Sequence, residues 1–362
     1  MRRRLIPLFV LVACAASMRA GAVAAEDGGA VAARDGGAPA SSETSTAEAA
    51  APRPGTPPDR RDVAPPPLGL RFAEPLEERT FRLAYRYERD KRQGLLVGSR
   101  DKKPSEVVPP NSFNPYDRTP RKLTLETHRF QLAWAPHPRV TLVAELPFEE
   151  MSLQSLLTTG ERVERSTDGI GDLALAVMLP FIRRGNESSH VAVGFHFPTG
   201  GIRRGGDQTR LPYDLQPGNG TVDFEWGWTY RGTWQRWSWG GQAQGLHPLG
   251  QNGLKYREGS RFEASLWGAR TLVRGLSASF RLEWEKQNNI RQNQSDPITD
   301  PSRNSKARGG VRFAANPGLS FKLPGQGDGR LAVEVEIPFY QDLDGPQLER
   351  DWLLTAGWQW DF

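Results

Sequence analysis

Carboxylates and arginines recur at every second position along many short segments of this 362-residue chain. Glu283 and Glu285 form one such pair, and Glu334 and Glu336 form another. Two carboxylates can act as general acid and base, but catalysis requires that they converge on one reacting group. A spacing of two places side chains on the same face of a β-strand, so such pairs arise wherever one strand face is polar. The spacing therefore favours a polar strand face over an acid–base pair.

The histidines give no alternative catalytic or metal-binding pattern. They are His128, His137, His190, His196 and His247. None stands with a serine in an arrangement typical of a nucleophile and its base, and no two have a spacing that suggests metal ligation. The glycine-rich segment 200–206 lacks the Lys-Ser/Thr of a phosphate-binding loop. We therefore expect no enzyme activity, no metal and no cofactor.

The elements that position the charges are predicted to be β-strands. In the closing segment, Trp352, Leu354, Ala356, Trp358 and Trp360 lie on one face, and small or polar residues lie on the other. About twelve such segments follow one another from residue 79 onward. The mean hydropathy is −0.57, and the mature chain has no run of 18 or more apolar residues that would form a transmembrane helix. Strands that are apolar on one face are typical of a transmembrane β-barrel.

The connections between these segments alternate between short turns and long loops. Turns are expected near residues 136–138, 184–186, 232–233, 274–275 and 326–329, and loops near 91–120, 151–167, 200–218, 248–257, 289–305 and 342–348. This layout is typical of outer-membrane barrels, with turns in the periplasm, loops outside and an even strand count. A soluble β-sandwich, the competing all-β fold, needs no such rhythm. We predict an antiparallel transmembrane β-barrel of about 12 strands in the cell outer membrane.

The polar strand faces are then expected to line the lumen, because a lone charge facing lipid costs about 2–4 kcal/mol near the midplane. Charges of both signs are interspersed, so cross-strand ion pairs are expected along a narrow pathway. A self-paired wall with no role in solute passage is equally compatible with the pattern. The pathway candidates are Arg82, Arg86, Glu145, Asp172, Asp223, Glu225, Arg281, Glu283, Arg312, Glu334 and Glu336. The same face is predicted to carry Glu88, Glu126, His128, Arg231, Arg261, Glu263, Glu285 and Lys322.

The last residues, Trp358, Trp360 and Phe362, suggest how the barrel is assembled. A final strand with alternating aromatic residues and a terminal phenylalanine resembles the assembly signal of bacterial outer-membrane barrels. That resemblance implies recognition by the barrel-assembly machinery, with outer-membrane lipid as the surrounding partner.

The first 25 residues are predicted to be a secretory signal peptide, because arginines at positions 2–4 precede an apolar run and small residues. Lipoprotein-type processing at Cys14 is the alternative. Cys14 is the only cysteine, so ordinary cleavage leaves no disulfide framework. Cleavage also removes four arginines and lowers the net charge from +5 to +1, which gives no reason to expect nucleic-acid binding.

Residues 26–68 are rich in alanine, proline, glycine and acidic side chains. They carry too few large apolar groups to offset the entropy of ordering, so we predict a disordered arm. The barrel is expected to occupy residues 69–362.

Three stretches resemble a family of outer-membrane transporters named for the meta-pathway of phenol degradation. They are Ser166–Leu173, with its Gly-x-Gly-Asp; Gly194–Gly200, which ends in Pro-Thr-Gly; and Leu215–Phe224, with a Gly-x-Gly before a strand that begins with Asp. The resemblance implies a barrel that passes small, aromatic or apolar molecules. The long alanine- and proline-rich arm departs from the family pattern.

The sequence thus favours a monomeric outer-membrane channel for small solutes, with a narrow mixed-charge lumen. A structural or adhesive role for the outer loops and the arm is one alternative. A barrel hydrolase is the other, and the absence of a catalytic pattern makes it less favoured.

Overall fold

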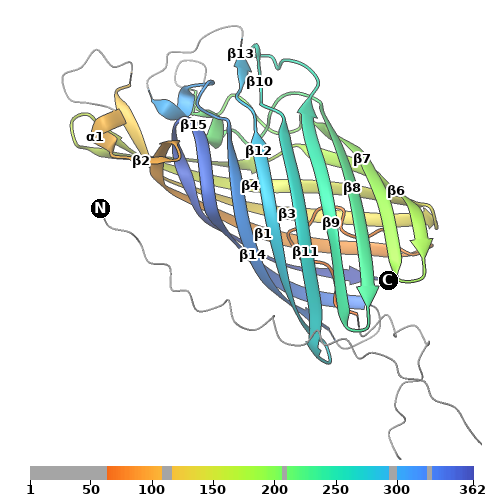
Figure 1. Ribbon diagram of the computed structural model, residues 1–362. Coiled ribbons are helices and arrows are strands. Elements are labelled where there is room, and N and C mark those ends of the chain that lie inside the picture. Colours follow the sequence, from red (N-terminus) through yellow and green to blue (C-terminus); the bar gives the residue numbers. More distant parts are fainter. Residues whose placement is uncertain (1–62, 108–115, 206–209, 293–299, 324–327) are drawn as a thin grey trace, which may run out of the picture. The chain divides into compact units, whose positions relative to one another are not determined.

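The computed structural model describes residues 63–107, 116–205, 210–292, 300–323 and 328–362. The predicted signal peptide and the arm up to residue 62 lie outside these residues. The regular secondary structure of the described residues is almost entirely β-strand (Figure 1). It contains no helix that is both long enough and apolar enough to span a membrane.

Eleven continuous strands form one closed wall. They are β1 (Phe81–Gly98), β3 (Arg118–His137), β4 (Val140–Leu157), β6 (Leu173–Arg184), β7 (Glu187–Phe197), β8 (Asp223–Trp234), β9 (Trp237–Pro248), β11 (Arg261–Val273), β12 (Leu276–Gln287), β14 (Gly310–Lys322) and β15 (Asp328–Asp361). The shorter elements are β2 (Arg100–Lys102), α1 (Pro104–Val107), β5 (Arg162–Ile170), η2 (Tyr213–Leu215), β10 (Tyr256–Arg257), β13 (Arg291–Gln292) and η3 (Pro301–Arg303).

Each wall strand pairs antiparallel with the next, and β15 closes the ring on β1. The 34-residue β15 supplies two neighbouring segments, because its first part pairs with β14 and its second with β1. The chain reverses near Gly345, whose φ of 82° is readily adopted by glycine. The wall therefore has twelve segments, the even number that antiparallel closure requires. The prediction of an all-β barrel of about 12 strands is confirmed.

The connections divide the barrel into two ends. Short turns join the strands at one end, where Phe81 and Phe362 also pair, and longer connections join them at the other. We call these the turn end and the loop end. Two predicted loops are wrong: residues 151–167 lie mostly in the β4–β5 hairpin, and residues 342–348 lie within β15. Strand segments that extend beyond the lipid need no apolar outer face, so their sequences lack the regular alternation that signals a lipid-facing strand.

The two faces of each strand differ sharply in chemistry. Leu266 on β11 is 69% exposed on the outside, whereas its neighbour Ser265 is 7% exposed and faces the lumen. This inside-out arrangement repeats around the ring, since large exposed apolar side chains stand on every wall strand. Such a surface suits lipid and not water.

The assignment of Glu126 and His128 to the lumen is wrong. Both share the outer face of β3 with Phe130. Tyr87 Oη donates to Glu126 at 2.7 Å, and Tyr85 Oη lies 2.7 Å from His128 Nδ1. Tyrosine and histidine tips of this kind belong to the polar ends of an aromatic band, where a lipid-facing strand tolerates them.

Candidate solute pathway

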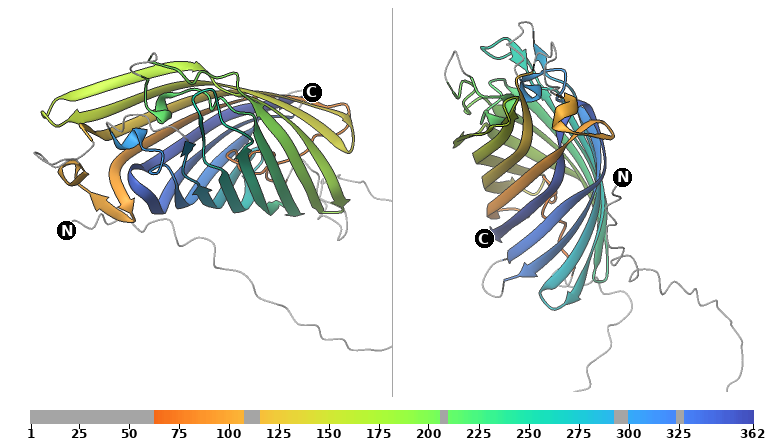
Figure 2. Two further views of the ribbon diagram at one scale, coloured as in Figure 1. Left: turned by 90° about the horizontal axis from the view of Figure 1, so that it is seen from above. Right: turned by 90° about the vertical axis from the view of Figure 1, so that its left-hand side faces the viewer.

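The lumen contains a stretch of chain that precedes the first strand. Residues 63–79, here called the lumen segment, contact inward-facing side chains from strands around the ring (Figure 2, orange). The predicted boundary between arm and barrel at residue 68/69 falls within this segment. Residues 63–68 also lie in the lumen, and the first strand begins only at Phe81.

The wall holds the lumen segment mainly by its backbone. Carbonyl oxygens of the segment accept hydrogen bonds from wall side chains, and two of its amides donate. The acceptors are the carbonyls of Ala64 (from Ser238, 2.6 Å), Pro66 (from Arg330, 2.9 Å), Leu68 (from Arg86, 3.3 Å), Arg71 (from Gln242, 2.5 Å) and Phe72 (from His190, 2.7 Å). The donors are the amides of Gly69 (to Glu334, 3.2 Å) and Leu76 (to Thr141, 3.1 Å).

Two apolar clusters also hold the lumen segment against the wall. Phe72 and Leu76 pack on a patch of small and medium side chains from β3, β4, β6 and β7, which includes Ala133, Val143 and Met178. On the opposite part of the wall, Leu70 and Ala64 pack with Trp267 and Ala269 of β11. Burial of these side chains excludes water from the segment's hydrogen bonds and so strengthens them.

Charges of the lumen segment join a network at mid-lumen. Buried Glu145 receives Arg71 at 3.4 Å and Arg129 at 3.3 Å, while Arg86 lies 3.6 Å away. Arg71 also lies 3.1 Å from Glu225, which contacts His196 at 3.0 Å. Buried carboxylates are tolerated because each faces cations that replace its hydration.

A second network ties β12, β14 and β15 together. Arg281 donates to Glu334 at 2.6 and 3.0 Å and to Asn316 at 3.0 Å, and it also pairs with Glu283. Since Glu334 also accepts from the amide of Gly69, this network reaches the lumen segment.

A third network lies nearer the loop end. Arg350 bridges Asp90 at 2.9 Å and Glu336 at 2.7 Å, and Arg312 pairs with Glu285. Together the three networks pair many of the charged side chains of the lumen wall with one another.

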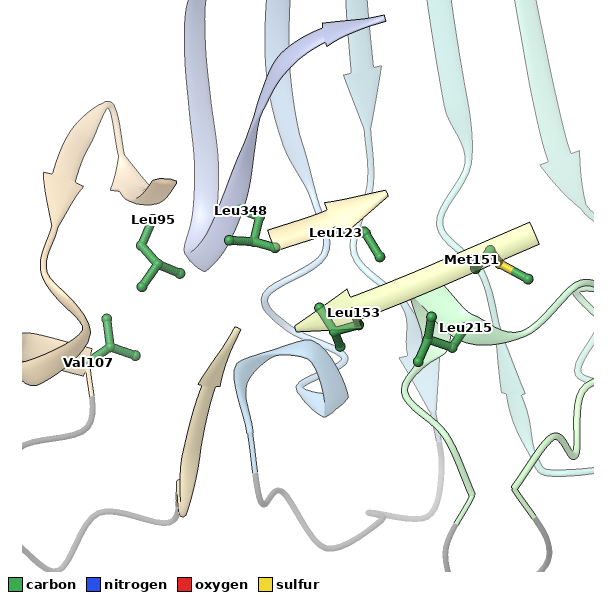
Figure 3. Packing of buried hydrophobic residues seen from close by; sticks show 7 residues of the cluster. All are labelled: Leu95, Val107, Leu123, Met151, Leu153, Leu215 and Leu348. Carbon is green, nitrogen blue, oxygen red and sulfur yellow. The ribbon is translucent and has the colours of Figure 1, made fainter. Parts of the chain in front are cut away.

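Apolar side chains gather on one part of the loop end. Leu95, Val107, Leu123, Met151, Leu153, Leu215 and Leu348 form one cluster from the strand ends and from the chain near α1 and η2 (Figure 3). Beside it, Arg308 donates to Asp214 at 2.7 Å. Burial alone would raise the pKa of Asp214, but the charge of Arg308 holds that pKa below its usual value.

Two cavities lie along the lumen on either side of the lumen segment. One, of about 230 Å³, is lined by Arg71, Arg129, Glu149, Asp172 and Glu263, and it lies toward the loop end. The other, of about 250 Å³, is lined by Glu74, Arg82, Arg231, Arg330 and Asp361 near the turn end. The lumen segment contributes lining to both cavities, and a narrower space of about 80 Å³ beside the segment shares lining residues with each of them.

Most of the pathway candidates belong to the three networks, and the other three lie elsewhere. Arg86, Glu145 and Glu225 meet at mid-lumen, and Arg281, Glu283 and Glu334 meet in the second network, with Arg312 and Glu336 in the third. Arg82 forms a bidentate pair with Asp361 (2.6 and 2.7 Å) near the turn end. Asp172 and Asp223 instead hold chain near the loop end: Asp172 accepts from the amides of Gly200 and Asn219, and Asp223 accepts from Thr221 and Asn219 side chains.

Several central residues were not predicted. Arg129 alternates with Phe130 and Leu132, so its inward direction was readable from the sequence. Asp90 and Arg350 lie beyond the apolar part of their strands, where alternation gives no signal. Arg71 lies on the lumen segment, which has no strand periodicity. Among the described residues, no group of three or more His, Cys, Asp or Glu side chains could hold a metal ion.

A closed antiparallel ring with an apolar exterior and a charged interior defines an outer-membrane β-barrel protein. The chain belongs to the family described as "Putative MetA-pathway of phenol degradation", whose model matches residues 112–338. This match confirms the resemblance seen in the three sequence stretches.

The comparison with solved structures also finds similar chains. The chain is similar to an outer-membrane channel from Pseudomonas putida F1, with 13% identity, a TM-score of 0.58, and coverage of 80% of this chain and 97% of that one. A Pseudomonas aeruginosa FadL homologue matches with 10% identity and a TM-score of 0.40, covering 80% of this chain and 93% of that one. The first likeness supports the fold alone, because the identity is too low to transfer a solute. No curated protein matches the sequence.

Proposed function

We propose that this protein is an outer-membrane channel for small solutes and that the lumen segment closes it in the conformation described above. The observation that carries the proposal is the position of residues 63–79 inside the lumen, where they line both cavities and leave only a narrow space of about 80 Å³ beside them. The barrel wall is continuous, whereas the segment between the cavities is held by hydrogen bonds, ion pairs and side-chain packing. Moving it would join the cavities without breaking a strand pair.

The lining of the pathway favours small solutes with an apolar or aromatic part. A solute that enters from the loop end meets the leucine-rich cluster before it meets the charged networks. An apolar group can partition into such a cluster, whereas a hydrated ion loses its shell there. The family description, which refers to phenol degradation, agrees with a small aromatic solute.

Planar-bilayer recording of a variant without residues 63–78 tests the channel. The deletion keeps Arg79, whose amide donates to Ala135 at the start of the wall. We expect step conductances on the order of tenfold above those of the wild type, because twelve segments enclose a lumen that side chains alone do not fill. Removal of residues 36–51, an equally long part of the arm, should leave the wild-type conductance unchanged. A folded deletion variant that stays closed would contradict the proposal.

We also propose that Phe362 both closes the ring and presents the assembly signal. Its amide and carbonyl exchange hydrogen bonds with Phe81 at 2.9 and 2.8 Å, and the two rings stack at 6.2 Å. Loss of these contacts destabilises closure by about 2 kcal/mol. Deletion of Phe362 should therefore sharply reduce heat-modifiable barrel in the outer-membrane fraction. Phe362→Ala keeps the backbone hydrogen bonds. A wild-type amount of heat-modifiable barrel for this variant would show that the aromatic ring is not part of the assembly signal.

The ring closes within one chain, with β15 paired to β1, so a single chain suffices for the proposed channel. We propose a monomer on this basis, with cross-linking in native membranes as the measurement.

A further inference from the structure

Three consecutive inward-facing residues of β8 contact the lumen segment. Gly227 lies under the ring of Phe72, since a Cβ placed at Gly227 would lie 3.6 Å from Phe72 Cδ2. Thr229 donates to the carbonyl of Phe72 at 3.4 Å, and Arg231 hydrogen-bonds the carboxylate of Glu74. One strand face thus contacts a benzene ring, a carbonyl and a carboxylate in sequence.

The ring of Phe72 is buried among apolar side chains of the wall. Phe72 is 6% exposed and packs in the cluster that contains Ala133, Val143, Met178 and Ala192. Its backbone has a φ of 52°, a conformation that is unfavourable for a bulky residue. His190 also donates to the Phe72 carbonyl, at 2.7 Å. The packing of the ring and the hydrogen bonds to the carbonyl must together offset the strain of this backbone conformation.

The carboxylate occupies a cationic corner of the turn-end cavity. Glu74 pairs with Arg231, and Arg82 and Arg330 line the same cavity. Burial alone would raise the pKa of Glu74, but the charges of Arg231, Arg82 and Arg330 hold that pKa below its usual value. Arg82 already has Asp361 as its partner. Within the described residues, Glu74 is the acidic group that pairs with Arg231, so its departure would leave this guanidinium open to another anion.

We propose that this part of the wall is a binding site for an aromatic carboxylate, and that Phe72 and Glu74 occupy it as an internal competitor. The inference rests on the proposed channel function and specifies its solute class. The solute places its ring over Gly227 and its carboxylate on Arg231, and it thereby displaces the lumen segment.

The chemistry of the site explains why both groups are needed. An apolar solute can replace the ring of Phe72 but leaves Arg231 paired with Glu74, so the lumen segment stays anchored. A small anion can compete for Arg231 but gains nothing from the ring pocket. A bidentate carboxylate matches the planar guanidinium, and the aromatic ring fills the space that the phenylalanine vacates.

The test uses the full-length protein in detergent micelles, with 3-phenylpropanoate as the probe and equilibrium dialysis as the readout. Phe72→Ala combined with Glu74→Gln removes the competitor and keeps the lumen segment. We expect this double variant to bind the probe at least about tenfold more tightly than the wild type. Adding Arg231→Gln should weaken the binding by about tenfold or more. Arg236→Gln, at an exposed turn beside the same strand, should leave it unchanged.

Two ligand controls define the class. In the double variant, 3-phenylpropan-1-ol lacks the charge and hexanoate lacks the ring, and both should bind about tenfold more weakly than 3-phenylpropanoate. Equal binding of the alcohol and the acid, or equal affinity of the wild type and a folded double variant, would overturn the proposal. Heat-modifiable mobility verifies that each variant is a barrel.

The two proposals fail separately. A deletion of residues 63–78 that conducts but shows no preference for 3-phenylpropanoate refutes the solute class and leaves the channel standing. Tight, Arg231-dependent binding by a barrel that never conducts refutes the channel and leaves the site standing.

Discussion

Replacement of Arg281 by methionine is expected to destabilise the barrel by about 3–5 kcal/mol, because it leaves buried carboxylates without their cation. Arg281 is 5% exposed on the inner face of β12. Its guanidinium donates to Glu334 and Asn316 and pairs with Glu283. Methionine fills much of the same volume but donates nothing, so the loss measures the charge rather than the packing.

The measurement is the denaturant midpoint of refolded protein in lipid vesicles, followed by tryptophan fluorescence. Arg274→Met, in the exposed β11–β12 turn, is the matched control and should change stability by less than about 0.5 kcal/mol. Adding Glu334→Gln to Arg281→Met should recover part of the loss, because a neutral amide costs less to bury than an unpaired carboxylate. An Arg281→Met barrel as stable as the wild type would show that water reaches and solvates these carboxylates.

Leu282→Arg, one residue further along β12, is expected to cost about 2–4 kcal/mol for the opposite reason. Leu282 is 46% exposed on the outer face near the middle of the strand, where an arginine would face hydrocarbon. Leu331 has nearly the same exposure, 45%, but lies near the turn end of β15. Leu331→Arg should cost only about 0–1 kcal/mol, since its charge can reach the interface.

Both variants replace leucine by arginine, so the difference between their losses of unfolding free energy depends on the depth of the two positions in the membrane and not on the type of substitution. The same vesicle unfolding assay measures both. Equal costs at the two positions would mean that the outer face does not span a lipid core between them.

The wall was predictable because two constraints act on every strand at once. Side chains alternate with period two, and charge cannot face lipid, so the direction of Arg281 or Glu334 follows from the position of Leu282 or Val333. The same rule applied strictly would have placed Glu126 and His128 outside, since they share parity with Phe130. That error came from judging residues by polarity instead of by register.

The lumen segment was not predictable for a physical reason. Its position depends on carbonyl groups that accept from Ser238, His190 and Gln242, and every residue type carries a carbonyl. From its sequence, a proline-rich stretch is therefore interpreted as a disordered linker. Its prolines have no backbone N–H, but their carbonyls can still accept hydrogen bonds from donors on the wall. The large apolar side chains Leu68, Leu70, Phe72 and Leu76 distinguish this stretch from residues 26–62, which contain no leucine or phenylalanine.

The seam between β15 and β1 has a consequence for the behaviour of the protein in a crowded bilayer. Because β15 pairs with β1 up to Phe81 and Phe362, the described wall has no unpaired edge strand to which another polypeptide could add by β-strand pairing. Neighbouring proteins can contact this barrel only through its apolar lipid-facing surface or its extramembrane loops. Any lateral association therefore depends on side-chain contacts and on the lipids between the proteins.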